Sequence, residues 1–369
     1  IKYTYTVAAG ATNRGEAANP VGATFRWNIN GKDFVYDGYT GLYECLGTWY
    51  YFENGDVNWN ANTLVKHGDS WFYVFNGEIA WDYVGLVKFY DTWYYVENGV
   101  VNFNATTLVY YYGDWYYVEN GVLNWNYTDL VYFYSDWYYV ENGKVNFNAI
   151  TLVNFCGDWY YVENGKVNFN AVTLVNFCGD WYYVENGKVN FNATTLCYYC
   201  GDWYYVENGK VNFNMTTLFY FYDKWYYVEN GKVNFNTTAF EFYDEWYYVE
   251  NGVVNFEATT LVYYGDAWYY VENGKLKFDA TTLCYYCGDW YYVENGKVNF
   301  DATKLFCFYD EWYYIEKGVL NWNSEAIATH DGVRYYVSGG KIAWDYTGDI
   351  VVNNIMYNVQ NGVVTDVAF

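Results

Sequence analysis

The chain has 369 residues, 26% of them aromatic, with 52 Tyr, 25 Phe and 19 Trp but a single Pro. Because aromatic side chains favour pleated, half-buried surfaces, this composition predicts an all-β protein. The formal net charge of −24 repels nucleic-acid phosphates and anionic lipid headgroups, which argues against nucleic acid as a partner. No run approaches the roughly 18 apolar residues that a membrane-spanning helix needs, so we expect no membrane insertion.

The first part of the chain, residues 1–40, is expected to be a degenerate repeat that caps the N-terminal end of a repeat array. The chain begins at Ile1 without Met or a signal-like segment, and from this we expect a mature form or a fragment.

A tandem array follows at residues 41–323, in which Trp recurs every 22 residues, with one step of 21 between Trp225 and Trp246. The recurring positions are Trp49, Trp71, Trp93, Trp115, Trp137, Trp159, Trp181, Trp203, Trp225, Trp246, Trp268, Trp290 and Trp312. After Trp312 the 22-residue pattern continues with Arg334 and Met356 in place of Trp. Residues 324–369 are therefore expected to be degenerate repeats that form the C-terminal cap.

The copy that begins at Trp159 shows how one repeat is expected to fold. Asn164-Gly165 separates two alternating segments, and Asn-Gly is the strongest short-range hairpin signal because a type I′ turn needs positive φ at both central residues. Closure by two residues pairs Glu163 with Lys166. The pairs further from the turn are Val162 with Val167, Tyr161 with Asn168, Tyr160 with Phe169 and Trp159 with Asn170.

Since side chains alternate across a strand, this hairpin has two faces. The face expected to point inward carries Tyr160, Val162, Val167 and Phe169. The opposite face carries Trp159, Tyr161, Asn168 and Asn170. The following segment, residues 171–175, is expected to add a short strand with Leu174 inward, and residues 176–180 to turn the chain into the next Trp.

An isolated two-stranded hairpin is only marginally stable in water, so neighbouring copies must bury one another. The predicted fold is an elongated β-solenoid of stacked β-hairpins with about 22 residues per repeat. Such an architecture does not provide one deep pocket of the kind that enzymes use.

The repeated Trp and the second Tyr after it are candidate stacking platforms for a ligand. The candidate residues are Trp115, Tyr117, Trp137, Tyr139, Trp159, Tyr161, Trp181, Tyr183, Trp203 and Tyr205. Two interpretations stay open, because the same rings are also suited to pack against the next hairpin and hold the array together. Any ligand site of this kind is weak in each copy and gains from multivalency.

The sequence gives no indication of catalysis. The two histidines, His67 and His330, have no neighbouring nucleophile pattern. The carboxylates are periodic, since Glu163 recurs as Glu185 and Glu207, and repetition in every copy indicates a structural face instead of a unique acid–base pair. We therefore expect that the chain is not an enzyme.

Eight cysteines occur, and two Cys-Tyr-Tyr-Cys segments, Cys197–Cys200 and Cys284–Cys287, mimic the halves of a zinc ribbon. They are separated by four copies of the repeat, which is too far to share one ion. Free thiols are the first expectation and disulfides the second. No metal or cofactor is expected.

The string Gly179-Asp180-Trp181-Tyr182-Tyr183 followed by Asn186-Gly187 resembles the cell-wall-binding repeats of Gram-positive bacterial surface proteins. That superfamily includes choline-binding, glucan-binding and clostridial-toxin repeats, and the resemblance covers about residues 40–369. It implies a secreted protein that folds as a hairpin solenoid. In choline binders, aromatic residues of consecutive hairpins form a cage for the quaternary ammonium group, which is a cation–π arrangement.

The sequence departs from choline-binding repeats at two places. Those repeats usually open with Thr-Gly-Trp, where this chain has Thr-Gly-Leu at Leu42, Val-Gly-Leu at Leu86 and Thr-Thr-Leu at Leu108. The Met that often follows the turn is Val here, as at Val167.

The resemblance and the aromatic repeat together predict a non-catalytic module on the surface of a Gram-positive bacterium, which attaches to a cell-wall polymer or polysaccharide. The alternative is a structural rod or a self-assembling extracellular filament without a small ligand, in which the partner is a second copy of the chain.

Overall fold

The computed structural model describes residues 25–29, 32–36, 38–45 and 47–368. Two strands at the N-terminal end, β1 (Phe25–Ile29) and β2 (Lys32–Tyr36), form a separate antiparallel pair. The rest of the expected N-terminal cap, residues 1–24, lies outside the described residues. The assignment of residues 1–40 and 324–369 as caps therefore stays a prediction.

The described elements are all β-strands, and from residue 41 each copy of the repeat supplies three of them. The first strands of the copies are β3 (Gly41–Cys45), β6 (Asn62–His67), β9 (Gly85–Phe89), β12 (Thr107–Tyr111), β15 (Asp129–Phe133), β18 (Ile150–Phe155), β21 (Thr173–Phe177), β24 (Thr195–Tyr199), β27 (Thr217–Phe221), β30 (Thr238–Phe242), β33 (Thr260–Tyr264), β36 (Thr282–Tyr286), β39 (Lys304–Phe308), β42 (Glu325–His330) and β45 (Gly348–Val352).

The second strand of each copy contains the recurring Trp and is called the long strand below. The long strands are β4 (Thr48–Glu53), β7 (Ser70–Phe75), β10 (Thr92–Glu97), β13 (Asp114–Glu119), β16 (Asp136–Glu141), β19 (Asp158–Glu163), β22 (Asp180–Glu185), β25 (Asp202–Glu207), β28 (Lys224–Glu229), β31 (Glu245–Glu250), β34 (Ala267–Glu272), β37 (Asp289–Glu294), β40 (Glu311–Glu316), β43 (Val333–Ser338) and β46 (Ile355–Gln360).

The third strand is short. The short strands are β5 (Asp56–Val57), β8 (Glu78–Ile79), β11 (Val100–Val101), β14 (Val122–Leu123), β17 (Lys144–Val145), β20 (Lys166–Val167), β23 (Lys188–Val189), β26 (Lys210–Val211), β29 (Lys232–Val233), β32 (Val253–Val254), β35 (Lys275–Leu276), β38 (Lys297–Val298), β41 (Val319–Leu320) and β44 (Lys341–Ile342), followed at the C-terminal end by the longer β47 (Val363–Ala368).

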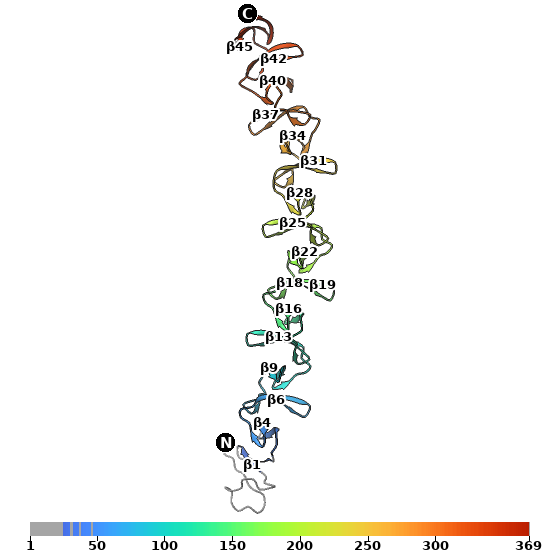
Figure 1. The fold of residues 1–369 in the computed structure, drawn as a ribbon, viewed down its shortest axis with the longest axis vertical. Helices are drawn as coiled ribbons and strands as arrows, with labels where there is room; N and C mark the ends of the chain where they lie inside the picture. Colours follow the sequence, from blue (N-terminus) through green and yellow to red (C-terminus); the bar gives the residue numbers. More distant parts are fainter. Residues whose placement is uncertain (1–24, 30–31, 37, 46, 369) are drawn as a thin grey trace, which may run out of the picture. The chain divides into compact units, whose positions relative to one another are not determined.

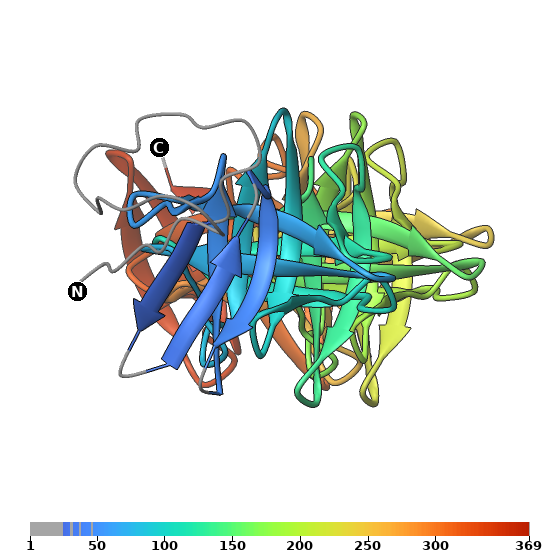
Figure 2. The same cartoon turned by 90° about the horizontal axis from the view of Figure 1, so that it is seen from below.

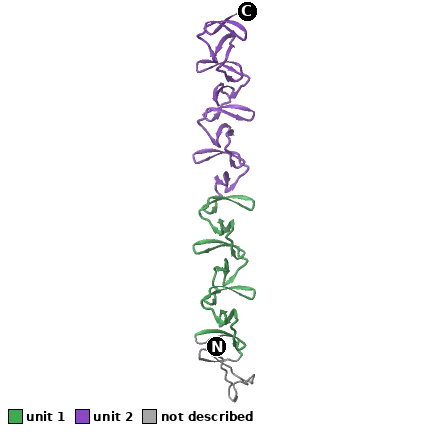
Figure 3. Ribbon diagram, turned by 90° about the vertical axis from the view of Figure 1, so that its left-hand side faces the viewer, with its two compact units in different colours: residues 1–190 green, residues 191–369 purple. Residues whose placement is uncertain are grey.

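The chain divides into two compact units, residues 1–190 and residues 191–369 (Figure 3). Within each unit the hairpins follow one another in chain order, and successive hairpins point in different directions (Figures 1 and 2). This confirms the predicted all-β solenoid of stacked hairpins with a repeat of about 22 residues. The described part of the chain contains no helix of the length and hydropathy that crossing a membrane requires.

The Asn-Gly turn has the predicted geometry. Asn164 has φ +51° and Gly165 has φ +73°, as a type I′ turn requires. The register next to the turn is confirmed, because Glu163 pairs with Lys166. The adjacent pair is Val162 with Val167.

The prediction that this pairing continues to Trp159 is wrong. The short strand β20 ends at Val167, and the chain then turns away after one more hydrogen bond, from the Asn168 amide to the Tyr161 carbonyl at 3.0 Å. The reason is that the edge of β19 is taken by the following copy, whose Lys188 pairs with Tyr160. Strand β19 therefore pairs on one edge with the short strands of two copies, β20 and β23.

The other edge of each long strand forms a second hairpin that the sequence pattern did not reveal at full length. Strand β21 pairs along its whole length with β22, from Thr173 opposite Val184 to Phe177 opposite Asp180. The turn between them is only Cys178-Gly179, with φ +52° and +93°. Residues 176–177, which were expected to belong to the turn, therefore lie in a strand. Leu174 is buried as predicted.

The assignment of one inward and one outward face is also wrong, because neighbouring copies cover both faces of a long strand. In β19, Val162 packs in a cluster with Leu130 of the preceding copy. Tyr161 packs on the opposite face in a cluster with Val184 of the following copy, and only 7% of its surface is exposed. Phe169, which was expected to point inward, is 46% exposed because the chain has already left the hairpin.

The glycine of the Asn-Gly turn makes the closest contact between copies. A Cβ on Gly165 would lie 2.5 Å from the carbonyl oxygen of Asn146 in the preceding copy. Two hydrogen bonds hold this contact, from the Gly165 amide to the Ala149 carbonyl at 3.2 Å and from the Tyr139 amide to the Gly165 carbonyl at 2.8 Å. A side chain on this residue is therefore excluded by backbone atoms.

Two glycines in one copy, at the two ends of strand β13, test this contact. Gly121 has φ +75° and a Cβ there would lie 2.5 Å from the Asn102 carbonyl oxygen, whereas Gly113 has φ +95° with open space around it. We expect Gly113→Ala to cost about 1–2 kcal/mol for the left-handed conformation alone. Gly121→Ala should cost about 1–3 kcal/mol more, because backbone atoms must move apart.

Hydrogen exchange measured residue by residue reports the difference locally. The Tyr95 amide, which donates to the Gly121 carbonyl at 2.8 Å, should lose protection in Gly121→Ala and keep it in Gly113→Ala. If the Tyr95 amide lost protection equally in the two variants, the close contact between copies would not be the reason that glycine is required at residue 121.

Candidate functional site

The stacking of copies creates a small hollow lined by aromatic rings, which we call the aromatic notch. One example, of about 100 Å³, has Trp71 of one copy facing Phe89, Tyr94 and Phe103 of the next. The Trp71 ring meets the Phe89 ring edge-on with centroids 5.3 Å apart. The Tyr94 and Phe103 rings are 6.1 Å apart. Four rings from two consecutive hairpins thus surround one space.

Strand alternation explains why these residues meet. Trp71 lies in β7 on the face that packs against the following copy, while Tyr94 lies in β10 on the face that packs against the preceding one. Phe89 ends strand β9 just before the hairpin turn. Phe103 follows the short strand β11 and remains 44% exposed at the rim.

The notch recurs in the second unit. Trp246 lies 5.0 Å from Tyr264 and 6.3 Å from Phe278, and the Tyr269 ring is 5.8 Å from Phe278. The contact between Trp and the aromatic residue 18 or 17 positions later has centroid distances of 5.0–5.9 Å in the following pairs: Trp93–Tyr111, Trp115–Phe133, Trp137–Phe155, Trp159–Phe177, Trp203–Phe221, Trp225–Phe242, Trp268–Tyr286 and Trp290–Phe308.

The floor of the notch is aliphatic. Leu64 and Val101 line it and are 4% and 6% exposed. Leu64 occupies the repeat position at which choline-binding repeats usually carry a second Trp. Leu42 and Leu86, at the same repeat position in neighbouring copies, are buried in the core as well. In this notch the position of the second Trp is therefore filled by Leu64, which forms the floor. The fourth aromatic ring is that of Phe103, which follows the Asn-Gly hairpin.

The tyrosine of the notch already attracts a cation from within the chain. The Lys166 ammonium lies 4.7 Å from the centroid of Tyr138, the tyrosine that corresponds to Tyr94 two copies earlier. Its Nζ also donates to Asp136 Oδ2 at 2.7 Å, and this hydrogen bond raises the pKa of Lys166. The same arrangement repeats at other copies, for example at Lys188 over Tyr160 and Lys341 over Tyr313.

Glu163 and Lys166 lie opposite each other across the turn as predicted, but their side chains bind different partners. The carboxylate of Glu163 accepts a hydrogen bond from the Asn168 amide group at 2.8 Å. The Asn168 side-chain oxygen in turn accepts from the Asn170 backbone amide at 3.1 Å. The periodic glutamates thus bind the asparagine that ends the hairpin, in agreement with the structural role predicted for them.

The ten candidate platform residues divide into two groups. Trp115, Trp137, Trp159, Trp181 and Trp203 are all half-buried. Tyr117, Tyr161, Tyr183 and Tyr205 are 6–7% exposed, and Tyr139 is half-buried. One face of Tyr117 is covered by the stacked ring of Tyr127 at 3.9 Å. The tryptophans therefore keep part of their surface exposed, whereas most of the second tyrosines are packed in the core.

The other notch residues were missed because the sequence places them in a turn or on a supposed inward face. Phe89 belongs to the aromatic segment before the hairpin turn, and Phe103 corresponds to Phe169. A signal was available, since the position 18 residues after Trp is aromatic or His from His67 to His330, at the 22-residue period. The two histidines lie 4.9 Å from Trp49 and 4.4 Å from Trp312.

Seven of the eight cysteines, all except Cys45, are free thiols. Cys156, Cys178, Cys200, Cys287 and Cys307 are exposed. Cys197 and Cys284 are buried at core positions, and burial raises the pKa of each thiol to about 11. Among the described residues no group of three or more His, Cys, Asp and Glu is arranged to hold a metal ion.

Burial also shifts the tyrosines of the core. The pKa of Tyr227, Tyr248 and Tyr270 is raised to about 12, first by burial and then by the neighbouring glutamate. Tyr127 has a pKa of about 12 from burial and then from Tyr117. Because an unfolded tyrosine ionises near pH 10, these groups favour the folded state as long as they stay protonated.

Alkaline pH should therefore unfold the protein. Below pH 10 the tyrosines are protonated in both states and their contribution is fully present. Between pH 10 and about 12 the unfolded chain loses protons that the folded chain retains, so the free energy of unfolding falls. Thermal unfolding followed by circular dichroism should give a melting temperature that is constant from pH 8 to 9 and falls steadily above 10; a constant value up to pH 12 would contradict this.

Comparison with known proteins identifies the repeat. The family model described as a choline-binding repeat matches fourteen segments in tandem. They are residues 38–58, 60–77, 82–102, 104–124, 126–146, 149–168, 171–190, 192–212, 214–234, 234–255, 258–277, 279–299, 305–321 and 327–343. No curated protein matches the chain.

Several solved structures are similar. Choline-binding protein F from Streptococcus pneumoniae is 23% identical over 82% of this chain and 97% of its own, with a TM-score of 0.25. CbpJ from the same species is 22% identical over 87% and 100%, with a TM-score of 0.21. The modular autolysin LytC, also from Streptococcus pneumoniae, is 19% identical over 66% and 54%, with a TM-score of 0.27.

Proposed function

Because the chain belongs to the choline-binding repeat family, we propose that it is a non-catalytic module that attaches to a cell-wall polymer by binding quaternary ammonium groups in its aromatic notches. The observation that carries this proposal is the notch itself, where four rings of two consecutive hairpins surround about 100 Å³ above an aliphatic floor. A cavity of about 150 Å³ lined by apolar side chains accepts benzene, so the notch suits a compact group such as trimethylammonium.

The electrostatics favour the same ligand. A cation within about 6 Å of an aromatic centroid is attracted by the ring quadrupole, with Trp the strongest partner. The lysines over the notch tyrosines show that these rings accept a positive charge at 4.7–5.3 Å. The net charge of −24 adds a long-range attraction for cationic groups.

The proposed partner is a polymer that carries many such groups, because many notches lie along one chain. Each notch binds weakly, and tethering several ligands to one polymer raises the overall affinity by multivalency. The proposed location is the surface of a Gram-positive bacterium or its surroundings, where cell-wall polymer is accessible. The chain's own tryptophans carry the binding in this proposal, and the buried second tyrosines support them by packing.

A second candidate function, self-assembly into a filament, is favoured by one observation. The tips of many hairpins carry a tyrosine that is 83–87% exposed. They are Tyr90, Tyr112, Tyr134, Tyr222, Tyr243 and Tyr309. These tyrosines lie at positive φ, a conformation that a bulky side chain adopts at some cost, and large exposed rings are enriched at protein interfaces.

Retention on a resin separates the two functions. A choline-bearing resin should retain the purified chain and release it with free choline, while an underivatised resin should not. A filament-forming protein would instead show long ordered assemblies in negative-stain electron microscopy without any ligand. Failure of the choline resin to retain a correctly folded chain would contradict the proposed function.

Substitutions at three notches of the second unit test the site. Replacing Trp225, Trp246 and Trp268 together with Leu should remove about three equivalents of bound choline in calorimetric titration, since each notch loses about 0.5–2 kcal/mol of cation–π attraction. The same three positions changed to Phe keep an aromatic face and should keep most of the equivalents. Equal behaviour of the Leu and Phe variants would mean that volume, and not the aromatic face, matters at these positions.

A further inference from the structure

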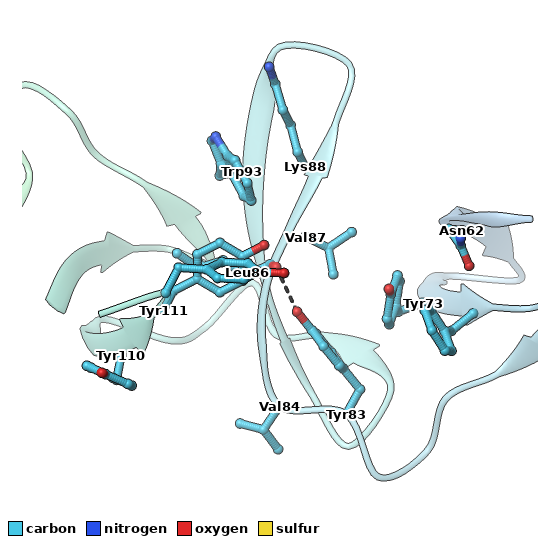
Figure 4. A pocket seen from close by; sticks show the side chains of 12 residues that line it. Asn62, Tyr73, Tyr83, Val84, Leu86, Val87, Lys88, Trp93, Tyr110 and Tyr111 are labelled. Atoms are coloured by element: carbon cyan, nitrogen blue, oxygen red, sulfur yellow. Dashed lines mark hydrogen bonds between the residues drawn. The ribbon is translucent and has the colours of Figure 1, made fainter. Parts of the chain in front are cut away.

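A larger hollow lies beside the notches of the first unit, and family membership does not account for it. It is a groove of about 510 Å³ between three successive hairpins (Figure 4). Tyr73 comes from the first hairpin, Tyr83, Lys88 and Trp93 from the second, and Tyr112 from the tip of the third. Binding sites for small molecules usually have 300–1,000 Å³, so this groove is large enough for a ligand of several rings.

Tyr83 gives the groove its shape. Its repeat position carries alanine in other copies, as at Ala105, Ala149 and Ala171. The Tyr83 ring lies 4.5 Å from Tyr73 and tilted by 50°, and its hydroxyl donates to the Leu86 carbonyl oxygen at 2.8 Å (Figure 4). The ring is therefore fixed in place and forms a wall that the alanine copies lack.

The groove combines ring faces with hydroxyl groups. Burial raises the pKa of Tyr83 above its usual range, and the nearby hydroxyls of Tyr111, Tyr73 and Tyr112 raise it further. Tyr112 also contributes, after burial, to the raised pKa of Tyr73 and to that of Tyr111. All four tyrosines line the groove. The Tyr83 hydroxyl donates its proton to Leu86 and can accept a hydrogen bond from a ligand, while the protonated hydroxyls of the other three can donate or accept.

The charge in the groove is opposite to that of the whole chain. None of the residues that line it is Asp or Glu, although the chain contains 43 of them. Lys88, the cross-strand partner of Trp93, supplies an ammonium group at one end (Figure 4). Within the described part of the chain no carboxylate forms an ion pair with it. At this end of the groove Lys88 repels a quaternary ammonium group and attracts an acidic group.

From these features we infer that the groove binds a short oligosaccharide that carries an acidic group. Sugar rings present apolar faces that stack on the tyrosine rings. Their hydroxyls exchange hydrogen bonds with the tyrosine hydroxyls, and the acidic group lies at Lys88. The groove shares Trp93 and Tyr111 with one ammonium-binding notch, so the two kinds of site are adjacent. A polymer that offers both groups would contact the chain at both kinds of site.

The test uses the full chain and two matched probes, trigalacturonic acid and its methyl ester, in calorimetric titration. The acid should bind about two- to fivefold more tightly than the neutral ester, as expected for one exposed charge pair. Lys88→Met should make the two affinities equal. Tyr83→Ala should weaken both by about tenfold through lost stacking, and alanine at this position folds normally in other copies.

Tyr127→Ala is the matched control. Tyr127 occupies the same repeat position and its hydroxyl donates to the Leu130 carbonyl at 3.2 Å, but it does not line the groove. It should leave saccharide affinity unchanged. The inference is overturned if the wild-type chain binds neither probe, if the two alanine variants lose affinity equally, or if Lys88→Met keeps the preference for acid. Choline equivalents measured on the same variants should not change, so a failure of choline binding would concern the notches alone.

Discussion

The contact between the Asn-Gly turn and the backbone of the preceding copy determines the rest of the structure. Gly165 lies so close to Asn146 that a Cβ would be 2.5 Å from its carbonyl oxygen. This contact sets the distance between consecutive long strands through main-chain atoms, which vary little from copy to copy. The aromatic residues are then brought together by the spacing of the backbone and not by their own attraction alone.

Each long strand has two buried faces, and this is why the aromatic hollows form between copies instead of within them. Trp faces the following copy and the next tyrosine faces the preceding one, so a notch needs residues from two hairpins. Such a site exists only in an array, and it is repeated as often as the hairpins are stacked. Weak binding at many identical positions suits a polymer with a repeated chemical group.

The constant backbone also allows single copies to acquire different chemistry. The position 18 residues after Trp is Phe in many copies, Tyr in others such as Tyr111, Tyr199 and Tyr264, and His at the two ends of the periodic array. The strands are present in all of these copies. Replacement of alanine by Tyr83 adds a wall beside the notches and creates the groove. Variation of this kind changes the side chains that one copy presents, while the contacts of the Asn-Gly turn keep the copies in register.

The sequence by itself determined the all-β class, the 22-residue period and the register next to the Asn-Gly turn, because positive φ at two central residues is a local property that Asn and Gly reveal. The tertiary structure alone decided which face of each strand is buried, since a one-dimensional pattern assigns one inward face whereas stacked copies bury both. It also decided that Phe103 lies at a notch rim and that Tyr161 lies in the core. The physical reason is that these positions depend on how closely the backbones of two neighbouring copies approach each other. The sequence of one copy of the repeat carries no information about that distance.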